Sequence, residues 1–375
     1  MPSLSLHLVM KMKLPKPRAG ILDVAPYVGG RHSVDGCKKV ILLASNETPL
    51  GASPNAIHTY RNAAENMHRY CDGHAADLRE SIGNRFCCDP ARIVCGAGSD
   101  EIIQMLIRAY AGPGEELIFS KHGFSIYPIF AIGAGVNPVA ADETNLTADI
   151  DEILSKVTDR TRLVFLANPN NPTGTYITKN SLVKLRERLR EDILLVLDGA
   201  YAEYVTRTDY TAGIELVEQN ENIVITRTCS KIFGLAALRL GWAYCPPAVA
   251  DVLNRIRSPF NVNGPAQAAG IAAMEDQAHT DRSLAHNEEW LPWLSNSLTE
   301  LGLDIVPSAA NFVLASFGNK SVAETVYQGL LNSGIITRHM TSYHLPDCLR
   351  ISVGLEDENK ALVNSLKDLV GKKNG

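Results

Sequence analysis

The chain has 375 residues, of which 45% are hydrophobic and 21% charged, and its formal net charge is -5. This balance is typical of a globular protein with a large core, and it does not indicate a nucleic-acid-binding surface. The eight cysteines are scattered without a CxxC pair, so they predict neither a zinc site nor a secreted disulfide framework. No apolar run approaches the roughly 20 residues of a membrane-spanning helix. We therefore expect a cytoplasmic enzyme with reduced thiols and no metal.

The beginning of the chain predicts an extended arm. Residues 4–10 form an apolar patch, and Lys11 and Lys13 follow it. Because the basic residues come after the apolar patch and no small-residue cleavage site appears, the pattern does not predict a signal peptide; it favours a mobile arm. Residues 15–31 are punctuated by proline and glycine, so we expect them to extend this arm without packed secondary structure.

A glycine-rich turn joins a predicted strand to a predicted helix near residue 98. The apolar residues 93–95 predict a short buried strand, and the GAGSD stretch at 96–100 leads into a helix that Ser99 or Asp100 could cap. A turn of small residues leaves backbone N–H groups at the positive end of a helix, which is a ready anion site. The alternative is that the glycines only permit tight packing.

Three apolar runs in the middle of the chain predict buried parallel strands, and a polar residue follows each of them. The runs are residues 163–167, 193–197 and 223–225, and the polar residues are Asn168, Asp198 and Lys231. They lie 30 and 33 residues apart, which is about one βα repeat. Ligands of open α/β sheets bind beyond the carboxyl ends of the strands, so we expect these side chains to converge on one crevice. Taken singly, each has an ordinary explanation as a turn, a cap or a solvated residue.

Lys231 is the most informative of the three. A lysine just past the end of a buried strand is an unusual place for a solvated charge, although a loop lysine is the simpler explanation of Ser230-Lys231 alone. A partly desolvated amine has a lowered pKa and can form a Schiff base with a carbonyl. The positions of Asn168 and Asp198 favour this covalent role.

Other elements complete the predicted architecture. Helices are predicted at 53–66, 76–86, 122–130, 181–190 and 213–219, and strands at 40–44 and 116–119. A further helix is predicted at 252–256. From residue 258 the pattern becomes α+β, with helices at 267–274, 279–301, 322–332 and 359–369 and strands at 304–306, 312–315 and 349–353. The strand 349–353 alternates, so Arg350 and Ser352 share one face. We predict an N-terminal arm with part of a small domain (1–45), a large domain (46–257) and a small C-terminal domain (258–375).

The predicted constellation suits pyridoxal phosphate. Lys231 would hold the aldehyde carbon, and the carboxylate of Asp198 would keep the ring nitrogen protonated, so that the ring can accept electrons. Asn168 and Tyr201 could bond the ring phenolate. The Gly98–Ser99 turn and Arg239 would hold the phosphate. Once freed, the Lys231 amine could move the substrate's α-proton.

Six motifs resemble the fold-type-I aminotransferases, most closely the histidinol-phosphate aminotransferase family. They are SNETPLG at 45–51, GAGSDE at 96–101, ANPNNPTG at 167–174, DGAY at 198–201, SKIFGLAALRLGW at 230–242 and LPDCLRISVG at 345–354. The resemblance covers nearly the whole chain in the family's order. It implies an α/β fold with a large domain built on a mostly parallel seven-stranded sheet, a smaller α+β domain made from the chain ends, and pyridoxal phosphate as cofactor.

The resemblance also implies roles for individual residues. Lys231, Asp198 and Tyr201 would be catalytic. The phosphate would be surrounded by Ala97, Gly98, Ser99, Thr228, Ser230 and Arg239. Phe124 would stack on the ring and Asn168 would bond its oxygen, while Tyr70 would reach the cofactor of a neighbouring subunit in a homodimer. The substrate would be bound by Tyr27, Asn46, Asn168, Arg338 and Arg350, with Arg350 holding its acidic group.

The chain departs from the family pattern at three places. Gly199 stands where glutamate is common, Phe124 where tyrosine is common, and Cys71 where proline is common. None of these changes removes a catalytic group, although the hydroxyl missing at Phe124 could loosen a contact with a polar substrate.

Four functions are consistent with these residues. The first is transamination between histidinol phosphate and 2-oxoglutarate, because two arginines, Arg338 and Arg350, suit a phosphate monoester. The second is an aromatic amino-acid aminotransferase, the third a lyase similar to threonine-phosphate decarboxylase, and the fourth a cofactor-binding chain without activity. The intact set of Asn168, Asp198, Lys231 and Arg239 argues against the fourth.

Overall fold

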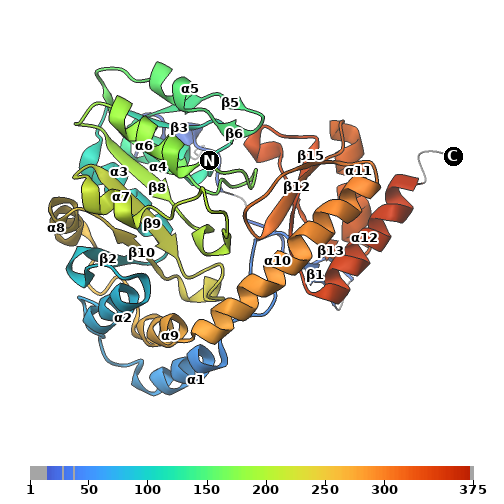
Figure 1. Ribbon diagram of the computed structural model, residues 1–375, viewed down its shortest axis with the longest axis horizontal. Coiled ribbons are helices and arrows are strands. Elements are labelled where there is room, and N and C mark those ends of the chain that lie inside the picture. The colour runs from blue at the N-terminus through green and yellow to red at the C-terminus, as the bar shows by residue number, and fades with distance from the viewer. Residues whose placement is uncertain (1–14, 28, 37–38, 372–375) are drawn as a thin grey trace, which may run out of the picture.

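A computed structural model describes residues 15–27, 29–36 and 39–371 of the protein. The apolar patch at residues 4–10 lies outside the described residues. The described residues of the segment 15–31 are mostly exposed, as expected of an arm, but they contain a short 3₁₀ helix at Ile21–Asp23. The described chain forms a larger lobe around a seven-stranded sheet and a smaller lobe around a four-stranded sheet, and helix α10 (Gln277–Glu300) runs from one to the other (Figure 1).

The seven-stranded sheet confirms the predicted fold class. Its strands lie in the order β2-β10-β9-β8-β7-β3-β4, and all neighbouring pairs are parallel except those of β10, which is antiparallel to both β2 and β9. The strands are β2 (Ile93–Gly96), β3 (Glu116–Ser120), β4 (Asn137–Ala141), β7 (Thr161–Ala167), β8 (Leu194–Asp198), β9 (Ile223–Thr228) and β10 (Gly241–Tyr244).

Both faces of this sheet are covered, which explains the continuous apolar runs in its strands. Along β7, Val164 and Leu166 join one buried cluster, whereas Leu163 and Phe165 join the cluster on the opposite face. One face is covered by α3 (Ser99–Tyr110), α4 (Ile126–Ala134) and α8 (Pro247–Ile256). The other is covered by α2 (Ala76–Phe86), α5 (Ile150–Ser155), α6 (Lys179–Arg188), α7 (Ile214–Gln219) and α9 (Gly264–Glu275).

The smaller sheet has the order β11-β12-β15-β14 and packs with α10, α11 (Lys320–Asn332) and α12 (Glu356–Gly371). Its strands are β11 (Asp304–Val306), β12 (Phe312–Ser316), β14 (Arg338–His339) and β15 (Cys348–Ser352). Beside it, β1 (Ile41–Leu42) pairs with β13 (Ile335–Ile336), so a segment from the first part of the chain joins this lobe. Helix α9 packs on α1 (Pro54–Ala63) and α2 in the larger lobe, although the predicted small domain begins at residue 258. The domain boundaries themselves stay a prediction.

Most predicted elements are present within three residues of their expected ends, and the exceptions have physical causes. The helix expected at 122–130 begins only at Ile126, so Phe124 lies in the loop before it. The N-cap of α3 is Gly98, without a side-chain cap, and Ser99 and Asp100 already lie inside the helix, which corrects the expected capping. Helix α8 begins at Pro247, earlier than expected, because proline is favoured in a first helical turn.

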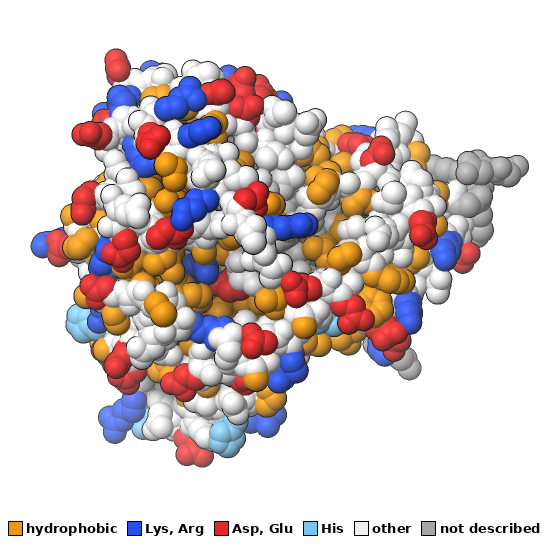
Figure 2. Space-filling view, in the orientation of Figure 1, with side chains coloured by type: hydrophobic (Ala, Val, Ile, Leu, Met, Phe, Trp, Pro, Cys, Tyr) orange, Lys and Arg blue, Asp and Glu red, His pale blue; other side chains and the backbone are white. Residues whose placement is uncertain are grey.

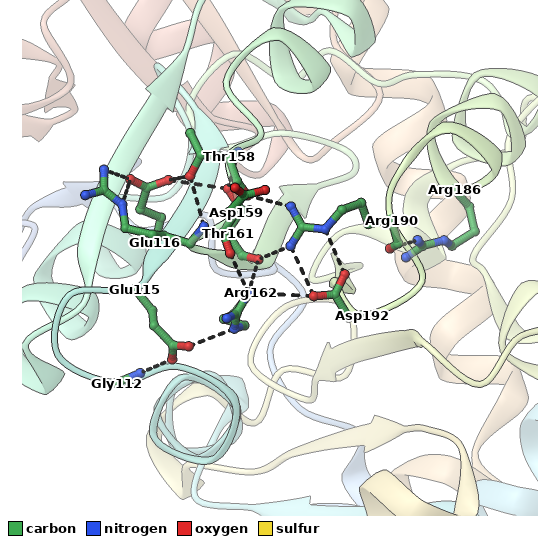
Figure 3. A network of polar contacts seen from close by, with 11 residues as sticks. Gly112, Glu115, Glu116, Thr158, Asp159, Thr161, Arg162, Arg186, Arg190 and Asp192 are labelled. Atoms are coloured by element: carbon green, nitrogen blue, oxygen red, sulfur yellow. Dashed lines mark hydrogen bonds and ion pairs between the residues drawn. The ribbon is translucent and has the colours of Figure 1, made fainter.

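A polar network joins the amino-terminal ends of β3, β7 and β8 (Figure 3). It lies at the opposite edge of the sheet from Ala167 and Asp198, which are at the carboxyl ends of β7 and β8. Glu116 is 3% exposed and accepts hydrogen bonds from Thr158 Oγ1 (2.6 Å) and Arg160 Nε (3.0 Å). Arg190 donates to the backbone oxygen of Thr161 at 3.1 Å. These bonds fix the amino ends of neighbouring strands.

Replacing Glu116 with glutamine should lower the free energy of unfolding at pH 7 by about 1–2 kcal/mol, because charged hydrogen bonds are lost at a buried site. The bonds from Thr158 and Arg160 lower the pKa of Glu116 below 4.5. Its stabilisation is therefore present above that value and is lost as the pH falls through the lowered pKa. Urea unfolding should show the wild-type advantage at pH 7 shrinking in acid; the same change at the exposed Glu187 is the control.

The surface carries both signs of charge interspersed over both lobes on the face shown in Figure 2. Within the described ranges, no helix is long and apolar enough to cross a membrane.

Candidate active site

A cavity of about 260 Å³ opens at the carboxyl ends of β7, β8 and β9, beside the smaller lobe. The register places Ala167 beside Asp198 and Asp198 beside Thr226, so the strand ends are level, as the spacing of the motifs predicts. Twelve of the predicted site residues line the cavity: Tyr27, Asn46, Ser99, Phe124, Asp198, Tyr201, Thr228, Ser230, Lys231, Arg239, Arg338 and Arg350.

Lys231 lies in the loop after β9, and its Nζ donates a hydrogen bond to the backbone oxygen of Ser45 at 2.9 Å. Burial lowers the pKa of this amine to about 8, and the positive charge of Arg350 adds to the effect. The ammonium group therefore loses its proton far more easily than a solvated lysine does. This is the property that a nucleophilic or proton-transferring amine requires.

Asp198 is the last residue of β8 and is 3% exposed. Burial raises the pKa of its carboxyl group to about 6, although hydrogen bonds from Tyr127 and Thr226 oppose this rise. Tyr127 Oη donates to Oδ2 at 2.6 Å, and Thr226 Oγ1 donates to Oδ1 at 3.2 Å. A buried carboxylate held in this way can bind a protonated ring nitrogen in the cavity.

Tyr201 and Asn46 form a hydrogen-bonded pair on the wall of the cavity. Asn46 Nδ2 donates to Tyr201 Oη at 2.9 Å, and Lys231 Nζ lies 5.8 Å from the centre of the Tyr201 ring. Asn46 Oδ1 accepts from Ser352 Oγ at 3.0 Å, which joins the pair to β15. Burial raises the pKa of Tyr201 to about 12, so its hydroxyl keeps a proton to donate.

The turn before α3 and the loop before β10 form a polar corner of the cavity. Arg239 donates to Ser230 Oγ at 3.3 Å and to Asp100 Oδ2 at 3.2 Å. Its guanidinium lies directly over Gly98: a Cβ atom at Gly98, whose φ is +79°, would be 2.5 Å from Arg239 Nη2. A helix amino terminus and a guanidinium thus face the same corner, which suits an anion.

Arg350 and Arg338 lie opposite each other on β15 and β14 and line the side of the cavity formed by the smaller lobe. Arg350 is buried; it donates to the backbone oxygen of Ala44 at 2.6 Å and to Asn171 Oδ1, while its Nε has no hydrogen-bond partner among the described residues. A buried guanidinium with an unpaired nitrogen is costly unless a ligand completes its bonds. This side of the cavity therefore suits an acidic ligand group.

Four predicted residues do not line this cavity, and Asn168 requires a correction. Its amide oxygen accepts from the N–H of Ile177 at 2.9 Å and its amide nitrogen donates to the carbonyl of Ile177 at 3.1 Å, so both ends are used within the loop. Asn171, three residues further along, lines the cavity instead.

In the glycine turn, the N–H of Ala97 donates to Glu101 at 2.6 Å, and that of Gly98 donates to the backbone oxygen of Gly96 at 2.8 Å. These N–H groups hold the turn rather than face the cavity.

Tyr70, the fourth of these residues, is 85% exposed. Its ring stacks on that of Phe260, with centroids 4.5 Å apart.

The structure shows what surrounds each of the three residues that depart from the family pattern, Gly199, Phe124 and Cys71. Gly199 lies against Arg227, since a Cβ there would be 3.1 Å from Arg227 Cδ. Arg227 is buried and pairs with Glu203 at 3.2 Å. Phe124 presents a ring without a hydroxyl to the cavity, and Cys71 Sγ lies 3.2 Å from the backbone oxygen of Val262.

Sequence reasoning did not find several residues that act at the cavity, including Asn171, Glu47, His32, Tyr343 and, beneath Asp198, Tyr127. Signals existed for Asn171, which lies in the same asparagine-rich motif as Asn168, and for Glu47, which follows Asn46 in the motif at 45–51. Tyr127 had none, since a tyrosine in an apolar helix is usually part of the core.

Comparison with known proteins agrees with this geometry. The family model for aminotransferase class I and II matches residues 38–366, and the chain belongs to this family. Among its relatives, proteins named histidinol-phosphate aminotransferase are 53% identical in Paramagnetospirillum magneticum, covering 96% of this chain and 100% of the relative, and 52% identical in Rhodospirillum centenum, covering 95% and 99%. The resemblance inferred from the six motifs is thereby confirmed.

A solved structure extends the comparison to three dimensions. The histidinol-phosphate aminotransferase of Sinorhizobium meliloti, crystallised with pyridoxal-5'-phosphate, is 27% identical and superposes with a TM-score of 0.87, covering 96% of this chain and 100% of that one. L-threonine-O-3-phosphate decarboxylase of Porphyromonas gingivalis has a TM-score of 0.78 at 18% identity over 88% of this chain and 100% of that one, which shows a shared fold.

Proposed function

We propose that this chain is a pyridoxal-phosphate-dependent histidinol-phosphate aminotransferase of histidine biosynthesis. It would transfer the amino group of histidinol phosphate to 2-oxoglutarate, giving imidazole acetol phosphate and glutamate. The observation that carries this proposal is the meeting of Lys231, Asp198 and Arg239 in one cavity, in a chain about half identical to relatives of that name.

The residues of the cavity fit the cofactor. A desolvated lysine, a buried carboxylate and an anion-binding corner occur together, and each matches one part of pyridoxal phosphate. Bound there, the cofactor supplies an aldehyde and an electron-accepting ring. Ser99, Thr228, Ser230 and Arg239 would hold its phosphate, with Gly98 giving Arg239 room to approach. Asp198 would hold the ring nitrogen.

The wall residues would orient the ring and move protons. Phe124 would lie against one ring face, and Tyr201 would donate its hydroxyl proton to the ring oxygen. Asn171, which lines the cavity where Asn168 does not, would share that oxygen. Lys231, whose pKa is lowered to about 8, would take up and return the substrate's α-proton.

The acidic part of the substrate would lie between Arg338 and Arg350, with Tyr27 and Asn46 beside it. Two guanidinium groups match either the phosphate of histidinol phosphate or the carboxylates of 2-oxoglutarate, so one site can accept both substrates in turn.

Replacing Arg350 with lysine should raise KM for histidinol phosphate by about 10- to 100-fold, because a single ammonium cannot reproduce the guanidinium fork. The change keeps the positive charge, which limits damage to the fold. Steady-state kinetics would measure it. The matched control is Arg186→Lys, a buried arginine on α6 that donates to the backbone oxygens of Leu189 and Ile193 away from the cavity; an equal KM for both variants would contradict the assignment.

Replacing Gly98 with alanine should weaken pyridoxal phosphate binding at least tenfold, because the methyl group would displace the Arg239 guanidinium. It also forces alanine into a φ of +79° with a ψ of 168°, a region that is essentially restricted to glycine, which costs about 1–3 kcal/mol. The control Gly302→Ala separates these effects, since Gly302 has a φ of +82° but open space around it. Fluorescence titration of the cofactor-free proteins should therefore show weakened binding only for Gly98→Ala.

The donor profile tests the function itself. The purified enzyme would be assayed with 2-oxoglutarate and either histidinol phosphate, phenylalanine, tyrosine or threonine phosphate, and released carbon dioxide would be measured. We expect kcat/KM to be highest for histidinol phosphate without carbon dioxide release. Faster turnover of phenylalanine or tyrosine would indicate the aromatic aminotransferase, and carbon dioxide from threonine phosphate would indicate the lyase.

The working enzyme is proposed to be a cytoplasmic homodimer whose sites share Tyr70. Its exposed ring, stacked on Phe260, would reach the phosphate of the neighbouring subunit's cofactor. Sedimentation of wild type and Tyr70→Phe would measure the assembly, and cofactor titration of the same proteins would measure the lost hydroxyl contact.

A further inference from the structure

The carboxylate of Asp198 accepts a hydrogen bond from a tyrosine that is not among the residues lining the cavity. Tyr127 lies on α4, is 0% exposed, and donates its hydroxyl proton to Asp198 Oδ2 at 2.6 Å. Burial and the nearby carboxylate raise the pKa of Tyr127 well above its usual range. The hydroxyl therefore keeps its proton and remains a donor at any working pH.

The ring of Tyr127 is fixed on both sides by aromatic neighbours. Phe165 of β7 lies at 5.0 Å between ring centroids, and Phe124 meets it edge-on at 5.8 Å. This packing leaves the hydroxyl little freedom, so its position relative to Asp198 is set by the core. Tyr127 thus contacts two residues that line the cavity: its ring packs against Phe124, and its hydroxyl bonds Asp198.

Asp198 accepts other hydrogen bonds besides that from Tyr127, and it also faces the cavity. Thr226 Oγ1 donates to Oδ1 at the longer distance of 3.2 Å, and the N–H of Ala200 also bonds the carboxyl group. Asp198 itself lines the cavity. Burial, and to a smaller extent the nearby Asp100, raises the pKa of Asp198, and the donated hydrogen bonds oppose this rise and favour the ionised form.

Resting on the proposed function, we propose that Tyr127 is a positioning residue that keeps the Asp198 carboxylate ionised and aimed at the cofactor's ring nitrogen. It would do so without contacting the cofactor's nitrogen itself. Removing its hydroxyl leaves a buried carboxylate with one donor fewer, which favours the neutral acid and lets the group turn. A neutral acid holds a protonated ring nitrogen more weakly.

The test compares two cofactors that differ only at the ring nitrogen. The affinities of cofactor-free protein for pyridoxal phosphate and for its analogue with carbon in place of that nitrogen would be measured by fluorescence titration. Their ratio reports the Asp198 contact alone, because phosphate and aldehyde contacts are common to both. We expect Tyr127→Phe to reduce this ratio about tenfold, whereas general damage to the fold would weaken both ligands equally.

A matched control is Tyr244→Phe. Tyr244 is also buried in the sheet region and its hydroxyl also bonds a carboxylate, that of Glu218, away from the cavity. This variant should keep the wild-type ratio. An unchanged ratio in Tyr127→Phe, or an equal reduction in Tyr244→Phe, would overturn the proposal.

The experiment also separates this proposal from the proposed function. If wild type binds neither ligand, the cofactor assignment is wrong. If wild type prefers pyridoxal phosphate and Asp198→Asn abolishes that preference while Tyr127→Phe keeps it, only the role of Tyr127 is wrong. Thr226→Val should reduce the ratio of the two affinities by less than Tyr127→Phe does, because the hydrogen bond from Thr226 to Asp198 is longer.

Discussion

The Lys231→Ala variant should lose the visible absorbance of the lysine-bound cofactor and at least about 10⁴-fold of its turnover, since it loses both the covalent attachment and the proton-transferring amine. The lowered pKa of about 8 and the position of Nζ beside Tyr201 motivate this expectation. Absorbance spectra after reconstitution and single-turnover kinetics with histidinol phosphate would measure the two losses separately.

Lys360→Ala is the control for this experiment, because Lys360 is an exposed residue of α12 paired with Glu356. It should keep both the spectrum and the turnover of wild type. A Lys231→Ala enzyme that is fully active would show that the amine of another residue does the chemistry.

The second large effect is expected for Asp198→Asn, which should reduce kcat by roughly 10²- to 10³-fold while cofactor still binds. A neutral amide cannot stabilise positive charge on the ring nitrogen, so the ring would accept electrons less well. Reconstitution followed by steady-state kinetics would measure this loss, and the control is Asp304→Asn, at an exposed position of β11. An unchanged kcat would contradict the role of Asp198.

The same variant should have the opposite effect on the stability of the cofactor-free protein. Burial raises the pKa of Asp198 from 3.8 to about 6, so ionising it costs folding free energy. The contribution of Asp198 to stability is therefore most favourable below pH 3.8 and is lost as the pH rises through 6. At pH 7, Asp198→Asn removes an ionisation cost on the order of 3 kcal/mol. The loss of one accepted hydrogen bond, from Tyr127 or Thr226, offsets roughly 1 kcal/mol of this gain. Urea unfolding at pH 4 and pH 7 should show this gain only at the higher pH.

The sequence was most informative at the ends of the buried strands. Continuous apolar runs mark β7, β8 and β9, and because parallel strands end at the same edge, the spacing was enough to bring Asp198 and Lys231 together. Alternation in β15 likewise placed Arg350 and Ser352 on one face, where both contact the segment that carries Asn46.

The conformation of loops and the pairing of distant segments could not be predicted from the sequence. Asn168 and Asn171 have the same side chain three positions apart, and only the folded path of their loop decides which one faces the cavity. Strand β10 was missed because four residues with a glycine carry little local signal, and its direction is set by pairing with β2 and β9. The role of Tyr127 depends on a contact across 71 residues of sequence.

The antiparallel strand β10 restricts how this gene can change in length. Because β10 runs in the reverse direction, it begins at the same carboxyl edge where β9 ends, with Gly241 beside Thr228. Lys231 and Arg239 must therefore both be placed within the short segment between these two residues. An insertion or deletion there would move the arginine away from Gly98 or the lysine away from Tyr201. Length variation among functional homologues, and insertions in engineered libraries, should accordingly be excluded from residues 229–241 and tolerated in exposed connections such as residues 206–209.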